Sequence, residues 1–147
     1  MTKNIKHYDL ILRYEDSQII YKMSWLFLFT SLYGFYEGNH NIISFLHGCI
    51  FINSINYWRN PIRGFRRNID IFSNIMTLLY GSYYVYGLHN SHLYYYCILS
   101  VNINFVLSWL VYSLNRFRLS VLLHCFVHLG GNIGNLLLFT DIIREIQ

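Results

Sequence analysis

The chain has 147 residues, of which 54% are hydrophobic, 19% are aromatic and only 12% are charged. This balance leaves little solvated surface for a domain of this size and argues against a water-soluble fold. The net charge of +4 does not predict binding of nucleic acid, because the basic residues lie at the ends of apolar stretches and form no polar domain of their own.

The first predicted element is a polar N-terminal segment, residues 1–18, placed in the cytoplasm or on the membrane surface. Ile5, Tyr8 and Leu12 recur in it at helical spacing, a pattern that fits a short helix on the membrane surface as well as an irregular tail. The apolar part of the chain begins near Ile19. The pattern of a cleavable signal peptide is therefore missing, and the first span is expected to stay in the protein.

Uncharged stretches follow at about residues 23–36, 41–58, 71–88, 93–115 and 119–140. Each is close to the ~20 residues that an α-helix needs to cross a bilayer. The sequence therefore predicts an all-α fold, an integral membrane bundle of about five transmembrane helices formed by residues 19–140. Residues 141–147 are predicted to be a short C-terminal tail, and the connections are too short to hold a second domain.

The basic residues fall mostly on one side of such a bundle. With five spans, Arg144 is almost alone on one side of the membrane, and the other side holds Lys3, Lys6, Arg13, Arg59, Arg63, Arg66, Arg67, Arg116 and Arg118. Because basic loops stay in the cytoplasm, this asymmetry predicts a cytoplasmic N-terminus and a C-terminus on the opposite side. Tyrosines gather at the predicted outer ends, as amphipathic rings do at a headgroup boundary.

The loop "WRNPIRGFRRN", residues 58–68, contains four arginines and joins the second span to the third. Two interpretations are open: the arginines bind the phosphates of anionic lipids, or they only anchor and orient the helical hairpin. The positive-inside rule already requires charge at this position and favours the second interpretation.

Polar residues inside the spans recur at helical spacing and therefore share faces. On the last span, the shared face holds His124, His128, Gly131 and Asn135. The other stripes comprise His47, Ser54 and Trp58 on the second span, Asp70, Asn74, Thr77 and Gly81 on the third, and Ser100 and Asn104 on the fourth. Because polar groups that face lipid are costly, these stripes are predicted to turn towards the interior of the bundle.

The last span carries the strongest indication of chemistry. His124 and His128, four residues apart on one face, are suited to bind one Zn²⁺ through their ring nitrogens. A catalytic zinc takes a third protein ligand and activates a water molecule. Asp70 is then predicted to orient that water or act as a base, and Ser54 to stabilise the oxyanion. The alternative is that the histidines are neutral, hydrogen-bonded interior residues and that Asp70 pairs with an arginine of the preceding loop.

This arrangement resembles the CREST superfamily of membrane hydrolases and receptors, which includes the alkaline ceramidases and the adiponectin and progestin receptors. In that family a Ser lies one turn before a His near the end of one span, an Asp begins the next span, and HxxxH stands in the last. Ser54, Asp70, His124 and His128 match these positions. The resemblance covers at most residues 47–140 and implies zinc held by three histidines and, in the ceramidases, hydrolysis of a lipid amide.

The sequence departs from the family pattern at a metal ligand. Trp58 stands one turn after Ser54, where the family has its third zinc ligand, and about five spans replace the seven of the family core. Either His47, ~10 Å further along the same helix face, supplies the missing ligand, or the chain is a degenerate relative that keeps the bundle without the metal. The displacement of His47 favours the second possibility.

The predicted function is therefore a zinc-dependent hydrolase of lipid amides or esters, with catalytic Asp70 and Ser54 and a metal site of His124, His128 and His47. The alternative is a non-enzymatic structural or assembly protein of the membrane, and a transporter is a third option for which clear inverted repeats are missing. The expected partners are membrane lipids and another membrane protein that binds the GxxxG surface of Gly130 and Gly134.

Overall fold

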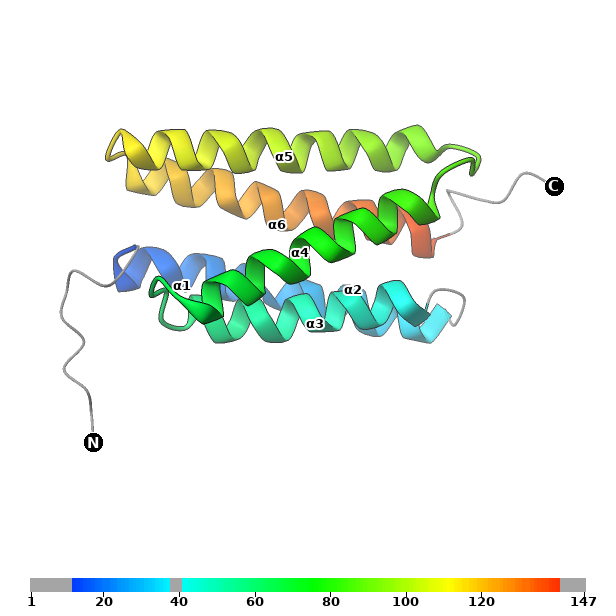
Figure 1. Ribbon diagram of the computed structural model, residues 1–147, viewed down its shortest axis with the longest axis horizontal. Helices are drawn as coiled ribbons and strands as arrows, with labels where there is room; N and C mark the ends of the chain where they lie inside the picture. Colours follow the sequence, from blue (N-terminus) through cyan, green and yellow to red (C-terminus); the bar gives the residue numbers. More distant parts are fainter. Residues whose placement is uncertain (1–11, 38–40, 141–147) are drawn as a thin grey trace.

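The structure is a computed structural model that describes residues 12–37 and 41–140. In this part of the chain it is all-α, with 85% of the residues in helices and no strand. The helices are α1 (Tyr14–Met23), α2 (Trp25–Glu37), α3 (Asn41–Trp58), α4 (Phe65–Tyr84), α5 (Ser91–Ser113) and α6 (Phe117–Phe139) (Figure 1). The predicted surface helix lies almost entirely outside the described residues, as does the predicted tail 141–147.

The first two helices form one interrupted rod. Ser24 is the one residue between them, and its hydroxyl donates a hydrogen bond to the Ile20 carbonyl oxygen, 3.0 Å away. A serine that bonds the carbonyl four residues earlier tends to bend a helix. Counted as rods, the described helices number five, in agreement with the five helical stretches that the sequence predicts.

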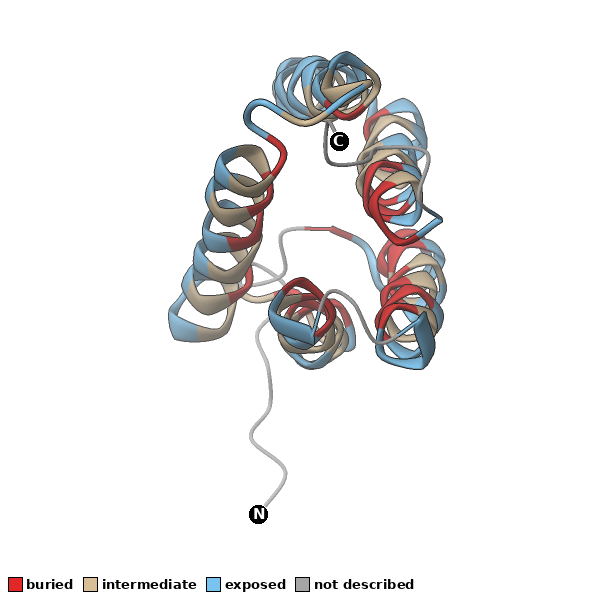
Figure 2. Ribbon diagram, turned by 90° about the vertical axis from the view of Figure 1, so that its right-hand side faces the viewer, coloured by how far each residue is buried: buried red, intermediate tan, exposed pale blue. Residues whose placement is uncertain are grey.

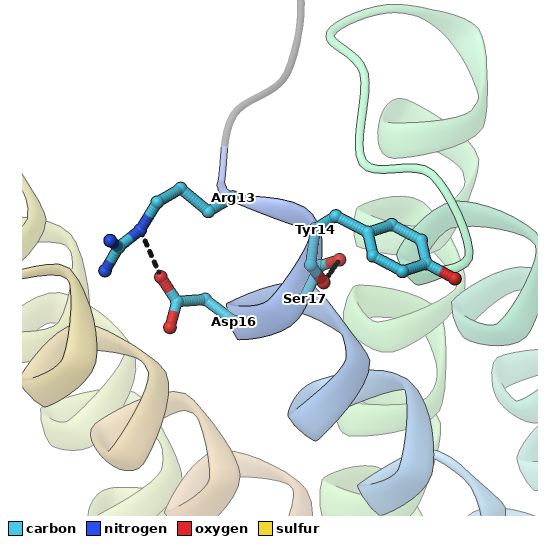
Figure 3. Close-up of polar contacts among 4 residues, drawn as sticks. All are labelled: Arg13, Tyr14, Asp16 and Ser17. Atoms are coloured by element: carbon cyan, nitrogen blue, oxygen red, sulfur yellow. Dashed lines mark hydrogen bonds and ion pairs between the residues drawn. The ribbon is translucent and has the colours of Figure 1, made fainter.

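The first rod begins at Tyr14, before the predicted boundary near Ile19. Arg13 Nε lies 3.0 Å from Asp16 Oδ2, and the Ser17 hydroxyl donates to the Tyr14 carbonyl oxygen at 2.7 Å (Figure 3). Asp16 is buried in the first turn, where the helix dipole favours a negative charge. Because of these local interactions, polar residues form the first turn of the rod. The start of the hydrophobic stretch near Ile19 therefore predicts a start of the helix that is too late.

The five rods are arranged in a ring. α3 packs against α2 and α4, and α6 packs against α1, α2 and α5. The end-on view of Figure 2 shows the buried residues on the helix sides that face the middle of the ring. The predicted inward stripes of α3, α4 and α6 lie on buried sides, with buried His47, Ser54, Trp58, Asp70, Thr77, Gly81, His128 and Asn135.

Hydrogen bonds from small hydroxyl side chains connect neighbouring rods. The Ser31 hydroxyl of α2 donates to the Ser44 carbonyl oxygen of α3 at 2.7 Å. Thr30 of α2 donates to the Asn132 side-chain oxygen of α6 at 2.5 Å. Buried polar contacts of this kind are typical of helix interfaces in membrane proteins, where apolar side chains alone do not drive association.

The stripe predicted on α5 does not turn inward as a whole. Ser100 is exposed on the outside of the bundle and Asn104 is half-buried, whereas Ser108 is buried. The Asn104 side-chain amide donates to the Ser100 carbonyl oxygen at 2.8 Å, so it bonds to its own helix. The prediction for Ser100 was wrong: its hydroxyl accepts a hydrogen bond from the Asn104 side chain of the same helix at 3.3 Å, and such local bonding lowers the cost of facing outward.

The GxxxG surface of α6 is used within the chain. A Cβ added at Gly130 would lie 3.0 Å from Val101 Cγ2 of α5, and one added at Gly134 would lie 3.2 Å from Cys97 Cβ. The two glycines therefore let α5 approach α6 closely. In the described residues α5 packs on this surface, and the binding of another membrane protein to Gly130 and Gly134 stays a prediction.

α4 and α5 are close together near the loop that connects them and then diverge (Figure 1). Near this loop the Tyr95 hydroxyl donates to the Ser82 carbonyl oxygen at 3.0 Å, and the Tyr94 side chain fills the space beside Gly81. Elsewhere the two helices have few contacts, in contrast to the extensive packing of α5 on α6. The ring is therefore held together loosely between α4 and α5.

The positive charge of the bundle is concentrated at one end of its long axis. The arginines within the described residues gather at the end formed by the start of α1 and the α3–α4 and α5–α6 connections: Arg13, Arg59, Arg63, Arg66, Arg67, Arg116 and Arg118. Of the helices that the structure describes, α5 and α6 are long and apolar enough to cross a membrane.

Candidate functional site

The interior of the ring contains a cavity of about 610 Å³. Residues of all six helices line it, and most of these side chains are apolar. The polar residues of the lining are His47, Arg63, Arg67, Asp70, Asn74, Thr77, Asn102, Ser108, Ser120, His124 and Asn135. A volume of this size and a mostly apolar wall with a few polar groups are typical of sites for small molecules.

Ser54 and Asp70 meet on the α3–α4 side of the bundle. Both are buried, and the Ser54 hydroxyl donates to Asp70 Oδ1 at 2.5 Å. Asp70 lines the cavity, whereas Ser54 does not. The two residues that the sequence predicts to be catalytic are thus neighbours.

The expected alternative partner of Asp70 is not found. Within residues 12–37 and 41–140 the one ion pair joins Arg13 and Asp16, so Asp70 forms none with Arg66 or Arg67. Arg66 instead donates from Nη1 to the Asn56 carbonyl oxygen at 3.3 Å. The hydroxyl of Ser54 is therefore the side-chain partner of the Asp70 carboxyl group.

The two histidines of the HxxxH pair lie next to each other on α6. The ring centroids of His124 and His128 are 5.2 Å apart, which agrees with their predicted position on one face. Their immediate neighbours are aromatic rings, and these separate the pair from the other candidate ligands.

Phe27 lies between His47 and the α6 pair. Its ring centroid is 5.4 Å from that of His47 and 5.0 Å from that of His128. The Phe27 ring therefore packs against both His47 and His128, the histidine that His47 was expected to join. The sequence analysis missed Phe27, because an apolar residue in an apolar helix carries no signal of its own.

Trp58 occupies the other approach to the pair. Its ring centroid is 4.9 Å from that of His124 and 4.7 Å from that of the neighbouring Tyr57. The residue that replaces the third ligand of the CREST pattern thus packs directly on a predicted zinc ligand. An indole offers no lone pair to a metal, since its nitrogen acts as a donor.

These residues do not fit the zinc site that the resemblance implies. Among the residues that the structure describes, no three His, Cys, Asp or Glu side chains lie close enough to hold one metal ion. Structural and catalytic zinc sites take three or four such ligands. His124 and His128 supply two neighbouring donors, but neither His47 nor Asp70 completes the set.

Several buried polar atoms around the cavity have no hydrogen-bond partner within the described part of the chain. They are both ring nitrogens of His47, Nε1 of Trp58 and Oδ1 of Asn135, all on residues that line the cavity. The prediction of hydrogen-bonded interior histidines is therefore not met at His47. Nδ1 of His128, a residue outside the cavity lining, likewise has no partner, and all of these atoms are buried from solvent. Because nearly all buried polar groups in proteins are hydrogen-bonded, such atoms lower the stability of the bundle.

Asn132 is another interior residue that the sequence analysis missed. It accepts a hydrogen bond from Thr30 and donates from its amide nitrogen to the His128 carbonyl oxygen at 2.7 Å. Its polar side chain inside an uncharged stretch was the available signal, but it lies off the predicted stripe.

Comparison of the chain with protein-family models, curated proteins and solved structures finds no match.

Proposed function

We propose that the chain is an integral membrane protein of five spans that binds an amphiphilic molecule in its interior and does so without a metal ion. The observation that carries the proposal is the cavity, whose wall combines apolar side chains with a few polar residues, among them His47, Asp70 and Asn135. An amphiphile has the apolar surface and the polar group that such a wall requires.

The outer surface supports residence in a membrane. Large hydrophobic side chains are exposed on every helix, among them Ile19, Phe29, Leu32, Ile52, Phe72, Leu79, Leu99, Trp109 and Leu122. Apolar surface on all sides of a bundle is costly in water and favourable in lipid. The arginine-rich end then faces the cytoplasm by the positive-inside rule, with the N-terminus on the same side.

The route into the cavity is supported by the divergence of α4 and α5. Ile75 of α4 and both Phe105 and Trp109 of α5 line the cavity and have large exposed fractions. Residues with both properties mark the place where the cavity reaches the outer surface. In a bilayer this opening faces the hydrocarbon region, from which an amphiphile enters sideways.

A zinc-dependent lipid hydrolase is the alternative, favoured by the contact between Ser54 and Asp70 and by the adjacent histidine pair. The non-catalytic proposal fits the geometry better, because Phe27 packs on His128, Trp58 packs on His124, and among the described residues no third possible ligand lies close to the pair. A degenerate member of a CREST-like family, with the bundle kept and the metal lost, has this arrangement.

Metal analysis of the purified protein distinguishes these two functions. Wild-type protein is expected to contain less than about one tenth of an equivalent of zinc, whereas Trp58→His, which adds an imidazole beside His124, is expected to bind zinc. The control variant with Trp58→His and His124→Ala should lose it. Stoichiometric zinc in the wild type that His128→Ala removes would contradict the metal-free proposal.

Lipid analysis tests the cavity itself. We expect one amphiphile per chain to remain bound after purification in a mild detergent, detected by mass spectrometry of the organic extract. Leu78→Trp fills the cavity and should remove the ligand, whereas Leu79→Trp, on the exposed side of the same helix, should keep it. Equal ligand content in both variants would show that the molecule is bound elsewhere.

A further inference from the structure

Two of the four arginines in the α3–α4 connection belong to the cavity, and two do not. Arg63 and Arg67 line its wall. Arg59 is exposed and is not part of the lining, and Arg66 donates to the backbone of α3. If the four arginines served membrane topology alone, none of them would need to line the cavity, because any arginine on this side of the bilayer satisfies the positive-inside rule.

The cavity is long and its two ends differ in charge. Along α5 its lining runs from Tyr94 to Tyr112, which corresponds to about 27 Å at the rise of an α-helix. Arg63 belongs to the α3–α4 connection and Arg67 to the first turn of α4, and α4 begins at the end of the bundle where α5 ends (Figure 1). From there the lining continues towards Tyr94 over mostly apolar side chains, with neutral polar side chains such as Asn74 and Thr77 among them. One end is therefore cationic, and the long remainder is mostly apolar.

The carboxylates near this end do not neutralise the two arginines. Across the described residues the one ion pair is that of Arg13 with Asp16, so neither Arg63 nor Arg67 has an acidic partner. Asp70, one turn after Arg67, is the acidic residue on the cavity wall, and its Oδ1 accepts the hydrogen bond from Ser54. The Arg67 guanidinium interacts with the side chain of Tyr57, which is a neutral group. Both guanidinium groups therefore keep their charge and further N–H donors for an anion from outside the chain.

We infer that the ligand of the cavity is an anionic amphiphile with one hydrocarbon chain, and that Arg63 and Arg67 bind its phosphate or carboxylate headgroup. The hydrocarbon chain extends from the arginines through the cavity towards Tyr94. Guanidinium groups bind both kinds of headgroup with paired, charge-assisted hydrogen bonds. The inference rests on the proposed function, to which it adds the charge of the ligand and its direction in the cavity.

The test uses the full chain in phosphatidylcholine nanodiscs and measures the Kd of tritiated probes with the same chain length. Hexadecyl phosphate and palmitate distinguish the two anionic headgroups, and hexadecanol is the uncharged reference. The test variant carries Arg63→Gln and Arg67→Gln. The matched control carries Arg59→Gln and Arg66→Gln, which remove the same charge from the same connection.

The anionic probe with the lower Kd for the wild type is expected to bind at least about tenfold more weakly to the test variant, and within about threefold of wild type to the control. Hexadecanol should bind all three proteins equally, which shows that the variants keep the cavity. Equal weakening by the two double substitutions, or wild-type binding of hexadecanol as tight as that of both anions, would overturn the inference. If no probe binds the wild type in a manner that Leu78→Trp abolishes, the proposed function itself fails.

Discussion

At the scale of single residues, Ser54 and Asp70 show what the interior requires. A buried carboxyl group needs a donor, and Ser54 supplies it across the α3–α4 interface at 2.5 Å. The interaction thus joins two helices and also fixes a polar group on the cavity wall. The same pair serves a structural purpose whether or not the protein is an enzyme.

Ser54→Ala is expected to lower the free energy of unfolding by about 1–3 kcal/mol, because it leaves the buried Asp70 carboxyl group without its donor. Ser73→Ala is the control: the Ser73 hydroxyl bonds the backbone oxygen of Asp70 within α4, so its loss should cost less than about 0.5 kcal/mol. Unfolding in mixed micelles with a rising fraction of dodecyl sulfate measures both values. Equal losses would show that the contact across the interface contributes no more than local bonding.

The inward position of His47, Ser54, Asp70 and His128 could be predicted from the sequence, because helical periodicity and the cost of polar groups in lipid both depend on local spacing. The lack of a third possible ligand beside His124 and His128 among the described residues could not be predicted in the same way. It depends on the position of Phe27, which comes from a different rod and reaches the histidines only through the packing of α2 between α3 and α6.

At the scale of helices, hydrophobic stretches predicted the rods well and their contacts poorly. The interruption at Ser24 and the early start at Tyr14 arise from single hydrogen bonds, which hydrophobic composition does not predict. The use of Gly130 and Gly134 against α5 also depends on which helix becomes the neighbour, and the motif alone does not specify this.

Gly81 determines how closely α4 and α5 approach near their connection. A Cβ at this position would collide with the Tyr94 hydroxyl and lie 3.0 Å from its Cζ. Gly81→Ala is therefore expected to destabilise the protein by about 1–3 kcal/mol in the same unfolding assay, although alanine alone favours a helix by about 1 kcal/mol. Combination with Tyr94→Phe, which removes the hydroxyl, should recover part of the loss.

Gly131→Ala is the matched control for this prediction. The nearest atom to its added Cβ is Phe27 Cε1 at 3.8 Å, an ordinary contact, so the substitution should be neutral or slightly stabilising. If Gly81→Ala behaves in the same way, the packing of Tyr94 on Gly81 does not control the approach of the two helices.

At the scale of the whole molecule, composition predicts a membrane environment, and the fold brings the arginines of the described residues to one end of the bundle. α5 and α6 have the length and hydropathy of membrane spans, whereas the number of rods that cross the bilayer is the part of the proposal that rests on surface and charge. The polar residues inside α3 and α4 lower the hydropathy of these helices because the same residues line the cavity. The mean hydropathy of a helix with one polar, inward face is therefore low even where its outer face is apolar.

Labelling of single cysteines distinguishes five spans from two. In a background without Cys49, Cys97 and Cys125, cysteines are placed at Asn60 in the α3–α4 connection, at Tyr86 after α4, and at Leu114 after α5. Five spans put Asn60→Cys and Leu114→Cys on one side of the membrane and Tyr86→Cys on the other. If α5 and α6 alone cross the bilayer, Asn60→Cys changes sides and joins Tyr86→Cys. We expect an impermeant maleimide added to inside-out vesicles to label Asn60→Cys and Leu114→Cys, and to label Tyr86→Cys only after the vesicles are opened with detergent.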